Sequence, residues 1–347
     1  MKIFDGHNDV LFKLHKGLRE ETGFLEESEE GHLDFVRAQA GGFAGGFFAV
    51  YSPTPGFELE PLLEETPDGY RFPLTPPVDR ASALEDVFGM AAQLFRTEAL
   101  SQGKFQVVRD VNSLESCLND GIMAAIFHIE GAECIDESLD TLDLLYAAGL
   151  RSLGPVWSRQ NIFGSGVPFT FPSTPDTGDG LTPIGRELVK RCNELGIMID
   201  LSHITERGFW DVASHSDAPL VATHSNVHAL SKSPRNLTDK QLATIAESDG
   251  MVGLNFAVAF LREDGRPVAD TPLEVMVRHL DYLLDKLGED RVGLGSDFDG
   301  AKIPEAIGDV RGLPKLVEAL KNHGYDNGLL EKIGYKNWLR VLGKTWK

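Results

Sequence analysis

The sequence predicts an α/β fold, a (β/α)8 barrel of the TIM type, formed by residues 1–347 as a single domain. Eight short runs rich in Val, Ile, Leu, Phe and Gly recur along the chain, and segments with helical spacing of apolar residues separate them. The runs do not alternate apolar and polar residues, which indicates strands buried on both faces of a parallel sheet. An open doubly wound sheet is the alternative, because one strand more or fewer would change the architecture.

The expected strands each lead into polar or Gly-rich residues. In chain order they are 2–5, 42–51, 122–129, 151–156, 196–201, 219–223, 250–255 and 291–296. Helices are clearest at 136–148, 182–195, 237–248 and 273–287. Thr182 followed by Pro183 is typical of a helix start, and Thr238 with Gln241 forms a capping-box pattern. Two final helices, at 314–323 and 329–342, are expected to close the barrel from outside.

Two long segments that follow expected strands interrupt this alternation of strands and helices. Residues 53–78 are rich in proline and acidic residues, and residues 163–180 are rich in Gly, Pro and Thr. Loops after the strands of a barrel lie on its catalytic face, so both segments are candidate walls or lids of an active site. The alternative is that they are surface loops without a role in the site.

The composition excludes several classes of protein. With 33 basic and 53 acidic residues the net charge is −20, which argues against nucleic acid as a partner. The apolar content of 42% is that of a chain with a buried core, and no apolar run has the length of a membrane span or a signal peptide. Cys117, Cys134 and Cys192 are too few for a disulfide framework. We therefore expect a cytoplasmic protein without a membrane partner.

Metal-ligand residue types gather at the ends of five of the eight expected strands. These ends carry His7 and Asp9, His128 and Glu130, Asp200 and His203, His224, and Asp297 and Asp299. A lone histidine at such a place is more often structural, but five strand ends meet at one face of a barrel. Imidazoles and carboxylates are ligands of Zn²⁺ and similar ions, and five of these side chains would suffice for two ions: His7, Asp9, Glu130, His203 and His224.

Such a centre predicts hydrolysis, because a water held between two metal ions loses a proton near neutral pH. Serine chemistry is disfavoured, since the G-x-S-x-G pattern is absent and Gly164-Ser165-Gly166 lies in an expected loop. The sequence contains neither a phosphate-binding loop nor a dinucleotide fingerprint.

These motifs resemble the membrane (renal) dipeptidase family of amidohydrolase-type metal-dependent barrels. The motifs are His7-x-Asp9, Glu130-Gly131-Ala132, Leu201-Ser202-His203, Thr223-His224-Ser225, Ser233-Pro234-Arg235-Asn236, Gly295-Ser296-Asp297-Phe298-Asp299-Gly300 and Asn337-Trp338-Leu339-Arg340-Val341-Leu342. The resemblance runs from residue 3 to the C-terminal motif, and several ordered motifs make it specific. It is closest to the soluble bacterial branch, because the signal peptide, lipid-anchor signal and disulfide cysteines of the animal enzymes are absent.

The resemblance implies a TIM-like barrel with two Zn²⁺ ions per chain. His7, Asp9 and Glu130 would bind one zinc, and Glu130, His203 and His224 the other, with Glu130 as the bridge. Asp297 resembles the family's catalytic acid, which takes a proton from the attacking water and passes it to the leaving amine. Arg235 matches the arginine that holds the substrate's terminal carboxylate, although an arginine in a turn could also form a surface ion pair.

One position departs from the family. Its well-known members carry a histidine after the fourth strand, and here Trp157 occupies that place. Arg159 is a candidate replacement; alternatively the metals suffice and Trp157 is a packed wall residue. Tyr70, Arg71 and Arg159 are further candidates for substrate contacts, and with Arg235 the arginines would favour an acidic second residue. His128, Asp200 and Asp299 are expected behind the ligands rather than among them.

We therefore expect a zinc-dependent dipeptidase that cleaves dipeptides with free ends, including ones with a D-residue at the second position. A related amidohydrolase acting on another small amide or lactam is the alternative enzyme. A catalytically inactive barrel that serves as a binding protein is the alternative from another class, although the complete ligand set argues against it. The resemblance also implies a possible homodimer.

Overall fold

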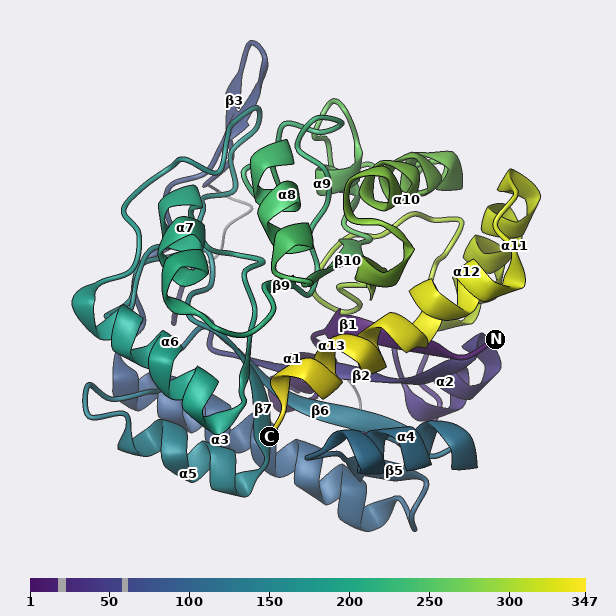
Figure 1. The fold of residues 1–347 in the computed structure, drawn as a ribbon, viewed down its shortest axis with the longest axis horizontal. Helices are drawn as coiled ribbons and strands as arrows, with labels where there is room; N and C mark the ends of the chain where they lie inside the picture. The colour runs from purple at the N-terminus through teal and green to yellow at the C-terminus, as the bar shows by residue number, and fades with distance from the viewer. Residues whose placement is uncertain (18–22, 58–61) are drawn as a thin grey trace.

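A computed structural model describes residues 1–17, 23–57 and 62–347, with strands in the interior and helices around them (Figure 1); the parallel strands pair into a ring. The ring strands are β1 (Ile3–Asn8), β2 (Phe43–Tyr51), β6 (Met123–Glu130), β7 (Leu150–Gly154), β8 (Met198–Ile199), β9 (Val221–Ala222), β10 (Met251–Asn255) and β11 (Val292–Gly295). Their order is β8-β7-β6-β2-β1-β11-β10-β9, and a parallel bridge between Asp200 and Val221 joins the two ends. The predicted (β/α)8 barrel is confirmed.

Helices follow most of these strands and cover the outside of the ring. They are α1 (Val10–His15), α2 (Phe35–Gly41), α3 (Arg80–Leu100), α4 (Val111–Asp120), α5 (Asp140–Ala148), α6 (Pro183–Leu195), α7 (Glu206–His215), α8 (Asp239–Glu247), α9 (Val258–Leu261), α10 (Leu273–Leu287), α11 (Leu313–His323), α12 (Asn327–Glu331) and α13 (Asn337–Thr345), with short 3-10 turns at Glu289–Arg291 and Val310–Gly312. No helix among the described residues is long and apolar enough to cross a membrane.

The predicted helix starts are confirmed at two positions. The hydroxyl of Thr182 accepts from the backbone N–H of Gly185, with Pro183 at the first helical position. Thr238 and Gln241 form both hydrogen bonds of a capping box. Each cap provides acceptors for backbone N–H groups that have no partner within the helix, which fixes where the helix begins.

The segment 53–78 contains structure that its composition did not predict. A hairpin of β3 (Glu64–Thr66) and β4 (Gly69–Arg71) projects from the body of the molecule (Figure 1), while residues 58–61 lie outside the described part. The long helix α3 follows. A short strand, β5 (Phe105–Val107), was also missed; it pairs with the first residues of β6 and takes no part in the ring.

The C-terminal region closes the end of the barrel opposite the strands' carboxyl ends. The expected helix 329–342 is α12, a π turn at Lys332–Lys336, and α13. Trp338 of α13 is fully buried among Phe4, Phe47 and Met251, and its indole N–H donates to the carbonyl of Leu294 at 3.2 Å. The helix α13 therefore places a side chain inside this end of the barrel, rather than only covering the barrel from outside.

Glycine makes room for this indole. A Cβ on Gly6 would lie 2.7 Å from the Trp338 ring, and a Cβ on Gly293 would lie 2.8 Å from it. Any side chain on these strand positions would displace Trp338 or the strand. The end of the barrel near Trp338 is thus apolar, and the polar residues lie at the carboxyl ends of the strands.

Candidate metal centre and active site

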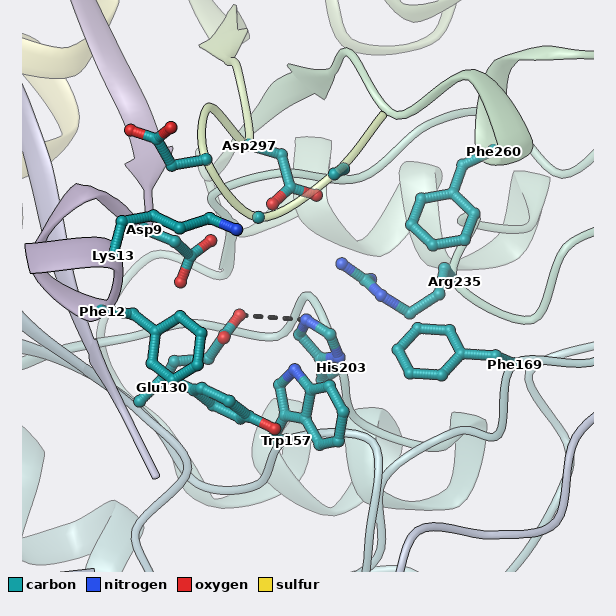
Figure 2. Close-up of a pocket in the computed structure, with 14 residues that line it drawn as sticks. Asp9, Phe12, Lys13, Glu130, Trp157, Phe169, His203, Arg235, Phe260 and Asp297 are labelled. Carbon is teal, nitrogen blue, oxygen red and sulfur yellow. Dashed lines mark ion pairs between the residues drawn. The ribbon is translucent and has the colours of Figure 1, made fainter. Parts of the chain in front are cut away.

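The metal-ligand residues predicted from the sequence converge at the carboxyl ends of the strands, where Figure 2 shows several of them around one cavity. His7 lies in β1, and Asp9 follows it at the start of α1. Glu130 is the last residue of β6, while His203 and His224 lie just after β8 and β9. All five side chains are buried. Parallel strands around a ring direct their ends to one face, which brings together residues more than 200 positions apart.

One carboxylate oxygen lies at the centre of the cluster. Oε1 of Glu130 is 3.0 Å from Nε2 of His203, 3.3 Å from Nε2 of His224 and 3.6 Å from Nε2 of His7. Oδ2 of Asp9 is 3.2 Å from Nε2 of His7. Although it is buried, Oε1 of Glu130 accepts no hydrogen bond from any residue that the structure describes. A buried carboxylate oxygen and imidazole nitrogens gathered in this way fit a bound cation. Imidazole nitrogen together with carboxylate oxygen is the ligand set of zinc and similar ions.

Hydrogen bonds behind the ligands orient the imidazoles. The hydroxyl of Thr223 donates to Oδ2 of Asp200 at 2.6 Å, so it accepts from Nδ1 of His224 at 2.8 Å. Nδ1 of His203 contacts the hydroxyl of Ser158 at 2.8 Å. Thr223 therefore fixes the tautomer of His224 that leaves Nε2 without a proton and directed at the centre, as metal ligation requires.

Burial and nearby charges shift the pKa values of the histidines and the carboxylates in different directions. Burial, reinforced by nearby positive groups including Arg235, lowers the pKa of His203 and of His224 well below the usual value, which keeps both imidazoles neutral. Burial also raises the pKa of Glu130 to about 8. For His7 burial acts to lower the pKa, but the carboxylates of Glu130 and Asp9 outweigh it and raise the pKa to about 10. The carboxylates beside His7 thus favour the positively charged form of its imidazole.

Asp297 lines the same cavity as Asp9, Glu130 and His203. It adopts a left-handed backbone conformation with φ of 58°, and its Oδ2 accepts from Nδ2 of Asn255 at 2.9 Å. Burial raises the pKa of Asp297, which suits a carboxyl group that exchanges protons. Next to it, a Cβ on Gly300 would lie 2.0 Å from Asp9 and 2.5 Å from Asp297, so the glycine allows these two carboxylates to approach each other.

Arg235 enters the cavity from the side opposite Lys13 (Figure 2). Its side chain is buried, Nη2 donates to the carbonyl of His224 at 3.2 Å, and the guanidinium lies 5.3 Å from the ring centre of Phe260. Nε and Nη1 have no partner among the described residues. A buried guanidinium with unused donors is able to bind a carboxylate. The cavity, of about 210 Å³, has room for a small ligand only.

Trp157 also lines the cavity, but the other expected substrate contacts lie elsewhere. Its indole packs 4.8 Å from the Tyr51 ring and 5.8 Å from the His203 ring, measured between centres. Tyr70 donates to the carbonyl of Gly265 at 3.0 Å, away from the cavity. Arg71 is exposed on the hairpin strand β4.

Arg159 does not reach the cavity, because its guanidinium is fully buried behind Tyr51 and Trp157. It donates to Oε1 of Glu133 at 2.7 Å and to the carbonyl of Ser52 at 2.5 Å. The expected group of arginines at one mouth is therefore not formed, and the preference for an acidic second residue loses its basis. Glu133 is the partner that sequence reasoning missed.

Of the three residues expected behind the proposed ligands, His128 and Asp200 do not line the cavity, whereas Asp299 does. Asp200 accepts from Ser202 and Thr223, and His128 contacts the hydroxyl of Ser152 at 2.9 Å while its ring lies edge-on to His7. His128 and Asp200 also lie near enough to His7 for the three to form a possible ligand group. Oδ1 of Asp299 accepts from the backbone N–H of His32.

Sequence reasoning missed Asn255, Tyr51, Phe12 and Lys13. Asn255 and Tyr51 are the last residues of their strands, so the rule that pointed to the proposed ligands also places both at this face of the barrel, without indicating a role for them. Phe12 and Lys13 lie in the first turn after Asp9, and a helical reading of α1 would have placed Lys13 one turn above that ligand.

Comparisons with known proteins agree with this geometry. Residues 1–347 match the family model described as membrane dipeptidase, peptidase family M19. A crystal structure of a metallo peptidase from Rhodobacter sphaeroides, liganded with a phosphinate mimic of the dipeptide L-Ala-D-Ala, is 53% identical with a TM-score of 0.96; the match covers 100% of this chain and 99% of that chain.

Two further proteins are similar. The "uncharacterized protein in pqqA 5'region" of Klebsiella pneumoniae is 51% identical over 249 residues, which are 72% of this chain and 92% of that protein. The probable dipeptidase PvdM of Pseudomonas aeruginosa shares the fold, with a TM-score of 0.83 at 22% identity over 99% of this chain and 95% of its own. The chain therefore belongs to the membrane dipeptidase family, peptidase family M19, and is a metal-dependent hydrolase of the dipeptidase class.

Proposed function

We propose that this chain hydrolyses the peptide bond of dipeptides at a centre of two zinc ions held by His7, Asp9, Glu130, His203 and His224. The observation that carries the proposal is the convergence of three imidazole nitrogens on Oε1 of Glu130, a buried oxygen without a hydrogen bond within residues 1–17, 23–57 and 62–347. Metal ions held by these residues would supply an activated water as the nucleophile and would polarise the scissile carbonyl.

The residues around this centre divide the remaining tasks. Asp297 accepts a proton from the attacking water and donates it to the leaving amine, and the hydrogen bond from Asn255 holds its carboxylate in place. Arg235 binds the substrate's terminal carboxylate through its unused N–H groups. Trp157 forms a wall of the cavity beside His203.

A D-residue at the second position is part of the proposal. It is supported by the L-Ala-D-Ala mimic in the Rhodobacter sphaeroides metallo peptidase, which is 53% identical to this chain. A reducing, cytoplasmic location is proposed as well, in keeping with three buried cysteines that form no disulfide. A homodimer remains a prediction from the family resemblance.

The test combines elemental analysis with assays of paired dipeptides. We expect zinc in the purified protein, loss of activity on chelation and its recovery with Zn²⁺, and cleavage of both L-Ala-L-Ala and L-Ala-D-Ala. Zinc with no cleavage of any dipeptide, but turnover of another small amide or lactam, would identify a different amidohydrolase. Activity in a demonstrably metal-free sample would overturn the mechanism.

A further inference from the structure

Lys13 brings a second cation to the cavity, opposite Arg235. Figure 2 shows the two side chains entering from opposite sides, with Glu130 and His203 between them. Lys13 belongs to α1, and its backbone N–H donates to the carbonyl of Asp9 at 3.3 Å. The helix therefore holds Lys13 one turn above a metal-ligand residue, at a position fixed by the strand that precedes it.

The ammonium group of Lys13 has no ion pair with any carboxylate of residues 1–17, 23–57 and 62–347, in contrast to Lys16 on the same helix, whose Nζ lies 2.7 Å from Oδ1 of Asp86. Lys13 shares the cavity with the carboxylates of Asp9, Glu130, Asp297 and Asp299. Asp9 lies 3.2 Å from Nε2 of His7, and Asp297 accepts from Asn255. Lys13 is partly buried, so an anion bound there would be partly shielded from water.

The direction of a bound dipeptide follows from the proposed function, on which this inference rests. With the terminal carboxylate at Arg235 and the scissile amide at Glu130, the N-terminal residue lies on the side of Lys13. The rings of Phe12 and Tyr51, 5.7 Å apart between centres, line the cavity there and offer an apolar surface for a methylene stem. A side chain that passes these rings meets the ammonium group of Lys13.

We propose that Lys13 selects dipeptides whose N-terminal residue has an acidic side chain, glutamate above all. The stem of such a residue packs on Phe12 and Tyr51, and its carboxylate forms a charge-assisted hydrogen bond with Nζ of Lys13. The substrate then has an anion at each end, one for Lys13 and one for Arg235. The acidic preference is thus proposed for the first residue of the dipeptide. The arginines expected from the sequence would instead have favoured an acidic second residue.

The first arm of the test needs no variant. L-Glu-D-Ala and L-Gln-D-Ala have nearly the same shape and differ in charge, and we expect kcat/KM to favour the glutamate substrate by about tenfold, at the low end for a hydrogen bond to a charged group. The reversed pair, L-Ala-D-Glu and L-Ala-D-Gln, is expected to show no such ratio. Equal values for the first pair, or a ratio confined to the reversed pair, would overturn the inference.

The second arm changes the charge of the protein. Lys13→Met is expected to bring the Glu/Gln ratio close to one, and Lys13→Glu to favour L-Lys-D-Ala over L-Glu-D-Ala. Lys16→Met, on the same helix, is the matched control and is expected to keep the wild-type ratio. Melting temperature and zinc content establish that each variant is folded and loaded. A wild-type ratio in folded Lys13→Met would exclude Lys13 as the selecting group.

The two proposals fail differently. If L-Ala-D-Ala is cleaved without any discrimination between Glu and Gln at the first residue, the dipeptidase proposal stands and the role of Lys13 is wrong. If the zinc-loaded protein cleaves no dipeptide, the proposed function is overturned, and the inference about Lys13 with it.

Discussion

Oε1 of Glu130 lies 3.0 Å from Nε2 of His203 without a hydrogen bond between them. In a buried site such a contact between two potential ligands is explained by a cation that both would bind. Glu130 also lies near His7 and His224, so under the proposed function it would belong to both metal sites.

Glu130→Gln is therefore expected to lose both zinc ions. The amide keeps the shape of the side chain but lacks the negative charge that a bridge between two cations requires. Activity is expected to fall further than the roughly 10²–10³-fold typical of losing one electrostatic contact. Elemental analysis and a dipeptide assay check this, and a variant that keeps two ions would remove Glu130 from the bridging position.

Asp297→Asn is expected to keep both ions and to lower kcat by about 10²–10⁴-fold, the range for a general acid–base group. Asparagine tolerates the left-handed conformation that Asp297 adopts, so the fold should be unaffected. Asp299→Asn is the matched control, because Asp299 has φ of 68° in the same loop, and its loss of kcat is expected to be much smaller. Loss of an ion from Asp297→Asn would make Asp297 a ligand.

The convergence of the five proposed ligands could be predicted from the sequence because their placement depends on short-range rules. His7 and Asp9 follow from the alternation of side chains along β1, and Glu130 from the end of β6. The strand-end rule applies to Asn255 as well, but its amide gave no sign of chemistry until the structure placed it 2.9 Å from Asp297.

Residues in long loops could not be placed in this way. Arg159 follows β7 as His203 and His224 follow β8 and β9, yet its guanidinium turns away from the cavity to Glu133. Tyr70 depends on the hairpin and on the chain near Gly265, a contact between residues 195 positions apart. Loop conformation of this kind is set by tertiary packing and leaves no periodic signal in the sequence.

Zinc affinity is expected to rise with pH across the neutral range. The pKa of Glu130 in the metal-free protein is raised to about 8 and the pKa of His7 to about 10, so at neutral pH this pair carries protons that ligation must displace. Below these pKa values, each unit of added pH removes the competing protons further and raises the affinity about tenfold for one proton released. Calorimetry in buffers of different ionisation heat measures the released protons. A pH-independent affinity would mean that the pair carries no proton for ligation to displace.

Arg235→Met is expected to lower kcat/KM for dipeptides by roughly 10- to 150-fold, since a hydrogen bond to a charged group contributes about 1.5–3 kcal/mol. Dipeptides with an amidated C-terminus lack the carboxylate, so they should be poor substrates already and lose little more. Comparing the loss for free dipeptides with the loss for amidated ones separates an effect on carboxylate binding from damage to the fold. An equal loss for free and amidated substrates would indicate that Arg235 acts through the carbonyl of His224 instead.

The buried pair of Arg159 and Glu133 predicts a large effect on stability. Their side chains are 0% and 1% exposed, and Nε of Arg159 lies 2.7 Å from Oε1 of Glu133. Arg159→Met leaves the Glu133 carboxylate buried without its cation, so the free energy of unfolding is expected to fall by about 3–5 kcal/mol. The double variant Arg159→Met with Glu133→Leu should recover much of this loss, because neither charge then remains unpaired.

Arg186→Met provides the control for this pair. Arg186 lies 3.3 Å from Asp211, but with 42% of its side chain exposed its loss should cost at most about 1 kcal/mol. Denaturant unfolding of the zinc-loaded proteins measures all of these values. If Arg159→Met unfolds like the wild type but loses its dipeptidase activity, Arg159 contributes to substrate turnover through Tyr51 and Trp157, the two cavity-lining rings that its guanidinium contacts.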